Sequence, residues 1–326
     1  MKSISAKIGI LFPTFAVHST HSPMPYKGEI AALLTALFWT VTAMAFEASS
    51  KRIGSLTLNL LRLFVAIGFF SVFSYFYRGM ALPTDAPAHA WIWLSVSAII
   101  CFVIGDFALF QSFILIGARV ALLIMSLVPP ITAFIAWLVL GEKLGLMNFI
   151  GMCVTLLGIA LVVLGRGEAK EQENFFQRIK LSYSVNGILL AVLGAACQAT
   201  GLVLSKLGMG DYDNFAASHI RVIVGAFSFA ILFSFMGKWK GLTTSLKDKK
   251  AMIALVIGAF FGPFLGVSFS LMAVKFANTG VASTIMSMAP VFIIPPAVLF
   301  FKEKLKWKEV IGSTIAVVGV ALFFLK

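Results

Sequence analysis

Charged side chains are scarce in this chain. Only 12% of its 326 residues are Asp, Glu, Lys or Arg, whereas 60% are hydrophobic, and the mean hydropathy is +0.99. A soluble domain carries about 25% charged residues. Too few polar side chains remain to cover a surface that faces water, so the composition predicts an integral membrane protein.

Motifs for disulfides, metals and nucleotides are also missing. The three cysteines, Cys101, Cys153 and Cys197, form no CxxC pair, and the four histidines form no HxxxH cluster. These absences argue against a disulfide framework, a zinc site and a di-iron oxidase. The phosphate-binding sequence GxxxxGK[ST] does not occur, which argues against ATP as a direct energy source. We therefore expect no metal and no cofactor.

The net charge of +13 does not indicate a nucleic-acid-binding protein. The basic residues lie in short runs between apolar blocks, as in Lys238–Lys250 and Lys302–Glu309. Such runs are typical of membrane loops beside anionic lipid headgroups. We therefore expect the lipid bilayer, and no nucleic acid, as the surroundings of these residues.

Ten apolar blocks have about the 20 residues that a bilayer-spanning helix needs. Backbone polar groups must be paired within the segment in lipid, so each block predicts an α-helix. The blocks are residues 28–47, 56–77, 91–116, 120–140, 146–164, 187–204, 215–236, 252–276, 281–301 and 310–324.

The links between the blocks divide the chain into parts. Residues 166–185 are charged and form a linker between two five-helix parts, residues 28–165 and 186–326. Residues 1–27 hold a weak apolar run that Pro13 interrupts, and we expect a disordered leader in which Met24 is an alternative start.

The two halves of the chain repeat one another. Ala121–Leu144 is matched by Ala282–Leu305 at an offset of 161 residues, and Arg62 is matched by Arg221 at an offset of 159. Each copy holds five helices, an odd number, so the second copy enters the membrane upside down. Inverted repeats of this kind place a substrate site near the midplane, between the halves. The sequence thus predicts an all-α integral membrane protein with ten transmembrane helices formed by two inverted five-helix repeats.

The motifs also carry a family resemblance. The segments LRLFVA around Arg62, GARVALLIMSLVPPITAFIAWLVLGEKL and ANTGVASTIMSMAPVFIIPPAVLFFKEKL resemble the EamA-type family of the drug/metabolite transporter superfamily. The resemblance covers residues 28–326. It implies the transport of small metabolites, commonly export, with both termini in the cytoplasm. The sequence departs from the family at Glu47, where a basic residue is common, whereas the second half keeps Lys206 at the matching position.

The distribution of the basic residues does not favour a cytoplasmic location of both termini. The loops on the N-terminal side hold eight Lys and Arg, and the loops on the other side hold sixteen. Cytoplasmic loops are normally richer in these residues, so the count places the N-terminus outside. The orientation therefore stays open.

These observations favour a secondary transporter, and not an enzyme. We expect an exporter of small organic metabolites such as amino acids or related compounds, in the bacterial cytoplasmic (inner) membrane, working by alternating access, with proton coupling as an option. The alternatives are a flippase for a lipid or a lipid-linked substrate and an integral membrane enzyme. A homodimer is a further option.

Ionisable side chains inside spanning helices cost about 2.5–3.5 kcal/mol at the helix centre, so each needs a partner or a function. Asp106 predicts either a site for a proton, a cation or a substrate ammonium group, or a structural ion pair. Its candidate partners are Arg62, Arg221 and Lys275. The two arginines suit a carboxylate, but their positions near helix starts favour side chains that snorkel to the headgroups.

Other polar and aromatic residues are weaker candidates. Glu47 ends the first helix and is either a gating residue or a solvated partner of Lys51. His219 is either a pH sensor or simply solvated. The site candidates that could orient a polar substrate or line an apolar cavity are Gln111, Gln198, Trp39 and Phe110.

Proline and glycine suggest where helices bend and pack. Prolines remove a backbone donor, so five of them are candidate hinges or static bends: Pro129, Pro130, Pro290, Pro295 and Pro296. Glycines spaced by four permit close helix approach, either inside the chain or at a dimer interface. These small-residue stripes are Gly258, Gly262 and Gly266, and Gly312, Ala316 and Gly319.

Overall fold

The computed structural model describes residues 26–166, 184–237, 239, 242–301 and 307–324. Residues 1–25 of the predicted leader and most of the predicted linker lie outside these ranges. Throughout the described ranges the chain is helical and holds no strand. Nine of the described helices are long and apolar enough to cross a membrane, and a further apolar helix, Val128–Leu140, has only 13 residues. The predicted all-α membrane class is confirmed, while the count of ten spans stays a prediction.

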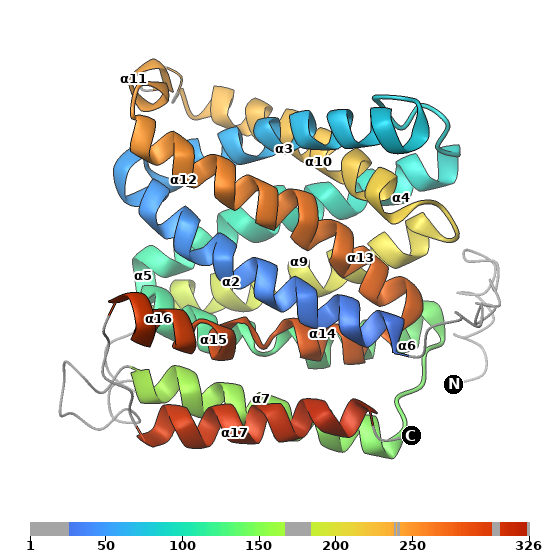
Figure 1. The fold of residues 1–326 in the computed structure, drawn as a ribbon, viewed down its shortest axis with the longest axis vertical. Helices are drawn as coiled ribbons and strands as arrows, with labels where there is room; N and C mark the ends of the chain where they lie inside the picture. Colours follow the sequence, from blue (N-terminus) through green and yellow to red (C-terminus); the bar gives the residue numbers. More distant parts are fainter. Residues whose placement is uncertain (1–25, 167–183, 238, 240–241, 302–306, 325–326) are drawn as a thin grey trace.

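The helices pack side by side (Figure 1), with α3 and α10 at one edge and the pair α7 and α17 at the other. The first half contains α2 (Lys27–Ile53), α3 (Ser55–Arg78), α4 (Ala88–Ala98), η1 (Ile99–Gly105), α5 (Asp106–Met125), α6 (Val128–Leu140) and α7 (Leu146–Arg166). The second half contains α9 (Val185–Met209), α10 (Asn214–Phe235), α11 (Leu242–Leu246), α12 (Lys249–Ala259), η4 (Phe260–Gly266), α13 (Val267–Phe276), α14 (Thr279–Met286), α15 (Ala289–Phe292), α16 (Ile294–Phe301), α17 (Trp307–Ala321) and η5 (Leu322–Phe324).

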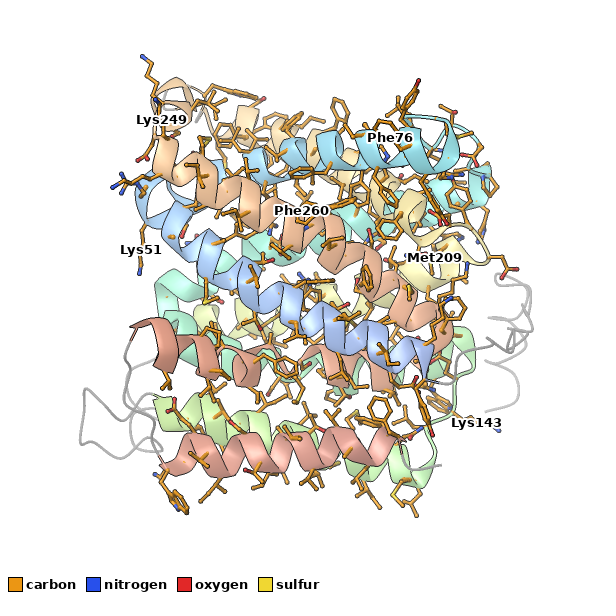
Figure 2. All side chains as sticks on the ribbon, viewed as in Figure 1. Lys51, Phe76, Lys143, Met209, Lys249 and Phe260 are labelled. Atoms are coloured by element: carbon orange, nitrogen blue, oxygen red, sulfur yellow. The ribbon has the colours of Figure 1, made fainter. Side chains whose placement is uncertain are left out.

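The helix bundle has two polar ends. Figure 2 shows Lys143 and Met209 at one end and Lys51 and Lys249 at the other. The end with Lys143 and Met209 also holds the first and last described residues of the chain. There the Tyr26 hydroxyl donates to the carbonyl oxygen of Phe324 at 3.0 Å. We call it the terminal end, and we call the end with Lys51 and Lys249 the opposite end.

Irregular backbone occurs at matching places in the two halves. The π-helical segments η1 and η4 are related by an offset of 161 residues, the offset of the sequence repeat. The same offset relates the break between α5 and α6 to the break between α14 and α15. Segments of π-helix are rare in proteins, and those that occur often lie at functional sites. The repeated sequence therefore adopts the same local conformations twice, while the inverted relation of the halves stays a prediction.

The predicted division between the third and fourth spans lies where the chain folds back along α9. The assigned helix continues from Ala88 to Met125, through the predicted gap between residues 116 and 120. Leu109 and Ile116 lie against Gly194 and Gly187 of α9, whereas Met125 lies again near Gln198, in the middle of α9. A second interruption, which the sequence did not predict, follows Met125, where the prolines suit the first turn of a new helix.

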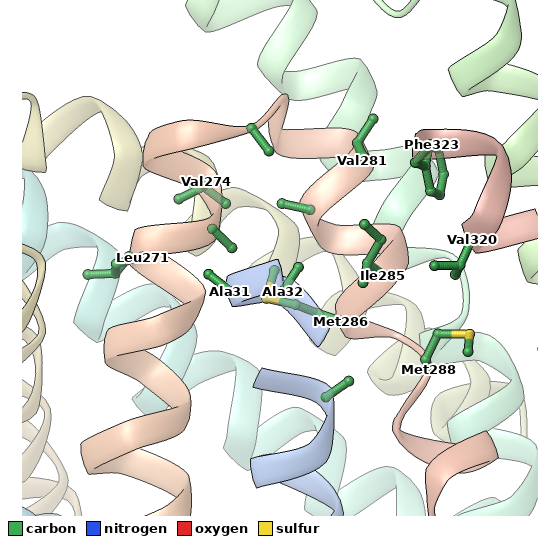
Figure 3. Packing of buried hydrophobic residues seen from close by; sticks show 14 of the residues in the cluster. Ala31, Ala32, Leu271, Val274, Val281, Ile285, Met286, Met288, Val320 and Phe323 are labelled. Atoms are coloured by element: carbon green, nitrogen blue, oxygen red, sulfur yellow. The ribbon is translucent and has the colours of Figure 1, made fainter. Parts of the chain in front are cut away.

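Small residues set the distances between the packed helices. Ala31 and Ala32 of α2 are fully buried between α13 and α14 (Figure 3). A Cβ atom on Gly158 of α7 would lie 2.3 Å from the backbone nitrogen of Ala316 in α17, so only glycine permits this approach. The predicted stripe at residues 258, 262 and 266 packs on Phe46, Thr42 and Trp39 of α2. Both small-residue stripes therefore form seams inside the chain.

Candidate functional site

A cavity of about 700 Å³ lies between the two halves, near the middle of the bundle. Its walls come from α2, η1, α7, α9, α10 and α13, and from the two helix breaks at residues 125–128 and 286–290. Most of the lining is apolar, with a few polar side chains: Thr40, Ser126, Gln198, Arg221, Ser270, Ser283 and Ser287. Ligand cavities typically have 300–1,000 Å³, apolar walls and a few placed polar groups. The cavity therefore has the size and the composition of a site for a small molecule.

Both halves contribute equivalent residues to the walls. At each break a methionine and a serine lie side by side in the sequence, and five wall residues of the first half have counterparts in the wall from the second half. The pairs are Met125 with Met286, Ser126 with Ser287 and Val128 with Ala289 at an offset of 161, and Trp39 with Gln198 and Ala43 with Leu202 at an offset of 159. The same sequence pattern thus contributes to the wall of this cavity from both halves of the chain.

A buried polar chain lies beside the cavity. The Arg62 guanidinium contacts the Asp106 carboxylate at 2.5 Å between Nη2 and Oδ2. The Gln198 side-chain amide donates to the other carboxylate oxygen at 3.1 Å, and the Cys101 thiol donates to the Gln198 amide oxygen at 2.9 Å. Asp106 is therefore held from both halves of the chain, and its charge is balanced by Arg62.

Arg221 contributes a second cation to this region. Its side chain is 3% exposed and lines the cavity, with the guanidinium 5.0 Å from the centre of the Phe102 ring. It interacts electrostatically with Cys101 and Asp106. Its Nε has no hydrogen-bond partner in the described part of the chain. Arg221 is thus the charged group that the cavity wall presents.

A second buried ion pair connects the halves at the terminal end. Glu142, in the loop after α6, contacts the Lys206 ammonium group at 2.6 Å. The same carboxylate accepts from the backbone N–H of Thr279 at 2.7 Å and from its hydroxyl at 2.8 Å, at the start of α14. Anionic groups stabilise the N-terminus of a helix, where N–H groups lack partners. The Glu-Lys-Leu sequence of the first half thus ties α6 to α9 and α14, while its second copy lies outside the described residues.

A model of the EamA-like transporter family matches residues 26–164 and again residues 185–325. The chain belongs to this family. The predicted membership of the drug/metabolite transporter superfamily is confirmed, and the protein is an integral, multi-pass membrane transporter.

Several known proteins are similar to this EamA-like transporter. An uncharacterised transporter of Archaeoglobus fulgidus is 22% identical over 91% of this chain and 97% of its own length. The uncharacterised transporter YyaM of Bacillus subtilis is 25% identical over 69% of this chain and 72% of its own length. A protein known from a crystal structure shares the fold, with a TM-score of 0.69 and 17% identity over 93% of this chain and 98% of its own. The family and the names of these relatives indicate a transporter, not an enzyme.

Two predictions about the ionisable residues of this transporter need correction, and of the three candidate partners of Asp106 it is Arg62 that forms the ion pair. Arg62 and Arg221 do not snorkel to the headgroups, because Arg62 pairs with Asp106 and Arg221 is buried in the cavity wall. His219 is not solvated: its ring is fully buried and stacks on Phe70 at 5.2 Å between ring centres. Lys275 binds the backbone carbonyls at residues 211 and 212 instead of Asp106.

The remaining site candidates fall in different places. Trp39 and Gln198 line the cavity, whereas Gln111 is half-buried and is absent from its lining. The side chains of Glu47 and Phe110 lie outside what the structure describes. Sequence reasoning missed the four wall serines, although the repeated tripeptide Ile-Met-Ser, which ends three residues before a proline, marks two of them, Ser126 and Ser287.

The candidate hinge prolines lie at helix starts instead of inside continuous helices. Pro129 and Pro290 occupy the first turns of α6 and α15. Pro130 follows in α6, and Pro295 and Pro296 lie in the first turn of α16. The first turn tolerates proline because its N–H groups have no partner within the helix. Hinge motion at these breaks stays a prediction.

No group of three or more His, Cys, Asp and Glu side chains gathers as a metal site within the described ranges.

Proposed function

We propose that this EamA-like transporter is a secondary transporter that exports small organic metabolites across the cytoplasmic membrane of a bacterium by alternating access. The observation that carries this proposal is the cavity of about 700 Å³, to whose wall both halves contribute, in part from equivalent positions. A site between two repeats can face either side of the membrane when the halves exchange their conformations.

The helix breaks support such an exchange. Each break, at residues 126–127 and 287–288, interrupts a span at the level of the cavity. Discontinuous helices at a substrate site are common in transporters, because their free backbone ends face the solute instead of lipid. The serines at the breaks, Ser126 and Ser287, supply hydroxyl groups at the same place.

The energy source follows from the missing nucleotide motif. The sequence has no GxxxxGK[ST], so solute or ion gradients drive transport in this proposal. Proton coupling would require a group that exchanges protons during the cycle, and Asp106 is the carboxyl group beside the cavity. If Asp106→Asn transports with an unchanged pH dependence, Asp106 does not couple transport to protons.

Transport by purified protein in liposomes tests the proposal. A pooled panel of amino acids, organic acids, organic amines and nucleosides is loaded, and the solutes that leave the liposomes are identified by mass spectrometry. Val128→Trp, in the cavity wall, should abolish the efflux, whereas Val317→Trp, on the exposed face of α17, should retain it. Absence of efflux for the whole panel by well-folded protein, or equal efflux by the two variants, contradicts the proposal. Lipid scrambling by the same liposomes would instead favour a flippase.

A further inference from the structure

The two halves differ in charge at one repeated position. Arg62 and Arg221 are equivalent, but the acid that neutralises Arg62 has no counterpart. The offset of 161 that relates Gly105 to Gly266 places Val267 at the position of Asp106. Val267 lines the cavity, as Arg221 does. The repeat therefore has two arginines and one acid, and the apolar residue in place of the second acid faces the cavity.

The charges of the described cluster do not cancel. Arg62 and Asp106 form one ion pair at 2.5 Å, and Gln198 and Cys101 are neutral donors. Arg221 adds a positive charge, and none of the described ion pairs involves it. Its side chain hydrogen-bonds the neutral Cys101 thiol and lies 5.0 Å from the centre of the Phe102 ring, so neither neighbour supplies an anion. A buried guanidinium without an anion is unfavourable, because neutral contacts do not fully replace the hydration that the charge loses on burial.

An anionic partner for Arg221 can bind inside the cavity. Among the described residues that line the cavity, Arg221 is the sole side chain with a full charge, and none of them is Asp or Glu. The surrounding walls are apolar, with Met125, Ile159 and Met286 among them. A molecule with one anionic group and an apolar body would satisfy both the guanidinium and the walls. A guanidinium binds a carboxylate through two parallel hydrogen bonds.

We infer that the solutes of this transporter are organic anions, bound with a carboxylate group against Arg221 and an apolar body between the two helix breaks. This inference rests on the proposed transport function and names its substrate class. Asp106 then has a positioning role. It holds Arg62 and Gln198, and its negative charge limits how tightly the anion binds, so that the solute is released after the halves exchange conformations.

The efflux panel gives the first test, and it separates the two proposals. Solutes that leave the liposomes should be carboxylates without a second, cationic group. If amines or neutral nucleosides leave and carboxylates do not, the inference is overturned while the transport proposal stands. If no solute leaves, the transport proposal fails.

Binding of three matched probes gives the second test. The probes 3-phenylpropanoate, 3-phenylpropanamide and 3-phenylpropylamine share an apolar body and differ in the charge of the head group. Their Kd values for the purified protein are measured by calorimetry at about pH 8, where the acid is ionised and the amine is protonated. The acid should bind at least about tenfold more tightly than the amide, and the amine should bind most weakly. Equal binding of acid and amide, or no binding of the acid, overturns the inference.

Variants of Arg221 and Asp106 test whether these residues cause the preference for the acid over the amide. Arg221→Gln should remove the preference for the acid over the amide, whereas Arg221→Lys should keep part of it. Asp106→Asn should tighten binding of the acid by about tenfold, because a nearby negative charge is lost. Arg52→Gln, at the exposed opposite end, is the matched control and should leave all three Kd values unchanged. Weaker binding of the acid by Asp106→Asn overturns the inference, even if Arg221→Gln does not fold.

The source of the anionic group is tested by competition. A lipid headgroup carries a phosphate that a guanidinium also binds. Short-chain phosphatidylglycerol should not displace 3-phenylpropanoate at equal concentration. If it does so and is itself moved across the bilayer, the anion belongs to a lipid and the inference of a soluble carboxylate is wrong.

Discussion

The two halves of the span Thr279–Phe301 differ in how firmly the structure holds them. Every residue of α14, at the terminal end, is buried, and its N-terminus is capped by Asn278 and by Glu142. At the other side of the break, Ile294 of α16 is buried in the core and Val298 is partly buried, whereas Pro295 is exposed. The described side chains of this span are therefore more fully buried at the terminal end than toward the opposite end.

The cavity wall follows the same gradient. Ser270 and Ser283, toward the terminal end, are each 3% exposed, whereas Ala43, toward the opposite end, is exposed. The opposite end is joined by the surface pair of Arg52 and Asp248, at 2.8 Å with side chains 47% and 27% exposed. The pKa of the Asp248 carboxyl is lowered by the backbone N–H of Ala251 that it caps and by Arg52. Under the proposed alternating access, we expect the cavity to open toward the opposite end in this conformation.

Removing the buried carboxylate of the terminal end should have the largest effect on stability. Glu142→Gln leaves the Lys206 ammonium group buried without its counter-ion and weakens the cap of α14. We expect the free energy of unfolding to fall by about 3 kcal/mol. Unfolding of the purified protein in mixed micelles measures the change. Lys143→Gln, the next residue in the same loop and exposed, serves as the control, and an equal loss in both variants would contradict the difference between the ends.

Chemical labelling should report which end opens the cavity. In a background where the exposed Cys153 is replaced by Ser, Ala43→Cys should react with a membrane-impermeant maleimide about tenfold faster than Ser283→Cys. Adding Glu142→Gln should reduce the ratio of the two labelling rates, because the loss of the ion pair with Lys206 makes Ser283→Cys at the terminal end more accessible. Faster labelling at Ser283→Cys would show that the cavity opens toward the terminal end instead.

A single hydroxyl group should make a smaller contribution at the same end. Thr279→Val removes the hydrogen bond from the side chain to Glu142 but keeps the backbone N–H that donates to it. The expected loss is about 1 kcal/mol in the free energy of unfolding. Thr314→Val is the control, because that exposed hydroxyl bonds only within its own helix. Equal losses would mean that the capping contact adds nothing specific.

The surface ion pair of the opposite end should contribute least. Arg52→Gln breaks its contact with Asp248, and we expect no measurable change in the unfolding midpoint, since exposed pairs are screened by water and salt. The midpoint is compared at low and high salt concentration. A destabilisation as large as that of Glu142→Gln would refute the view that the opposite end is held weakly.

Much of the fold could be predicted because its causes are local. Long apolar runs specify helices in lipid wherever they occur. The repeat was visible for the same reason, since matched residues lie at a constant offset. The helix break before Pro129 was not predicted, because proline also occurs within kinked spans and only the tertiary structure shows that the helix ends at Met125.

The site was predicted only in part. Arg62, Arg221, Asp106, Trp39 and Gln198 were identified because polar groups and tryptophan are conspicuous in apolar blocks. The ion pair between Arg62 and Asp106 could not be predicted. Arg62 and Arg221 occupy equivalent positions in the repeat, so the sequence does not show which of them contacts Asp106. The contact with Arg62 depends on how α3 packs beside η1 and α9, not on the spacing of residues along the chain.

The sequence by itself determined that the chain is a helical membrane protein made of two related halves, because hydrophobic length and repetition are properties of the linear chain. Only the tertiary structure decided which arginine is neutralised and which faces the cavity. Those outcomes depend on distances between side chains that are 44 residues apart, as in Arg62 and Asp106. Electrostatic energy falls with distance in space, and helix packing sets that distance.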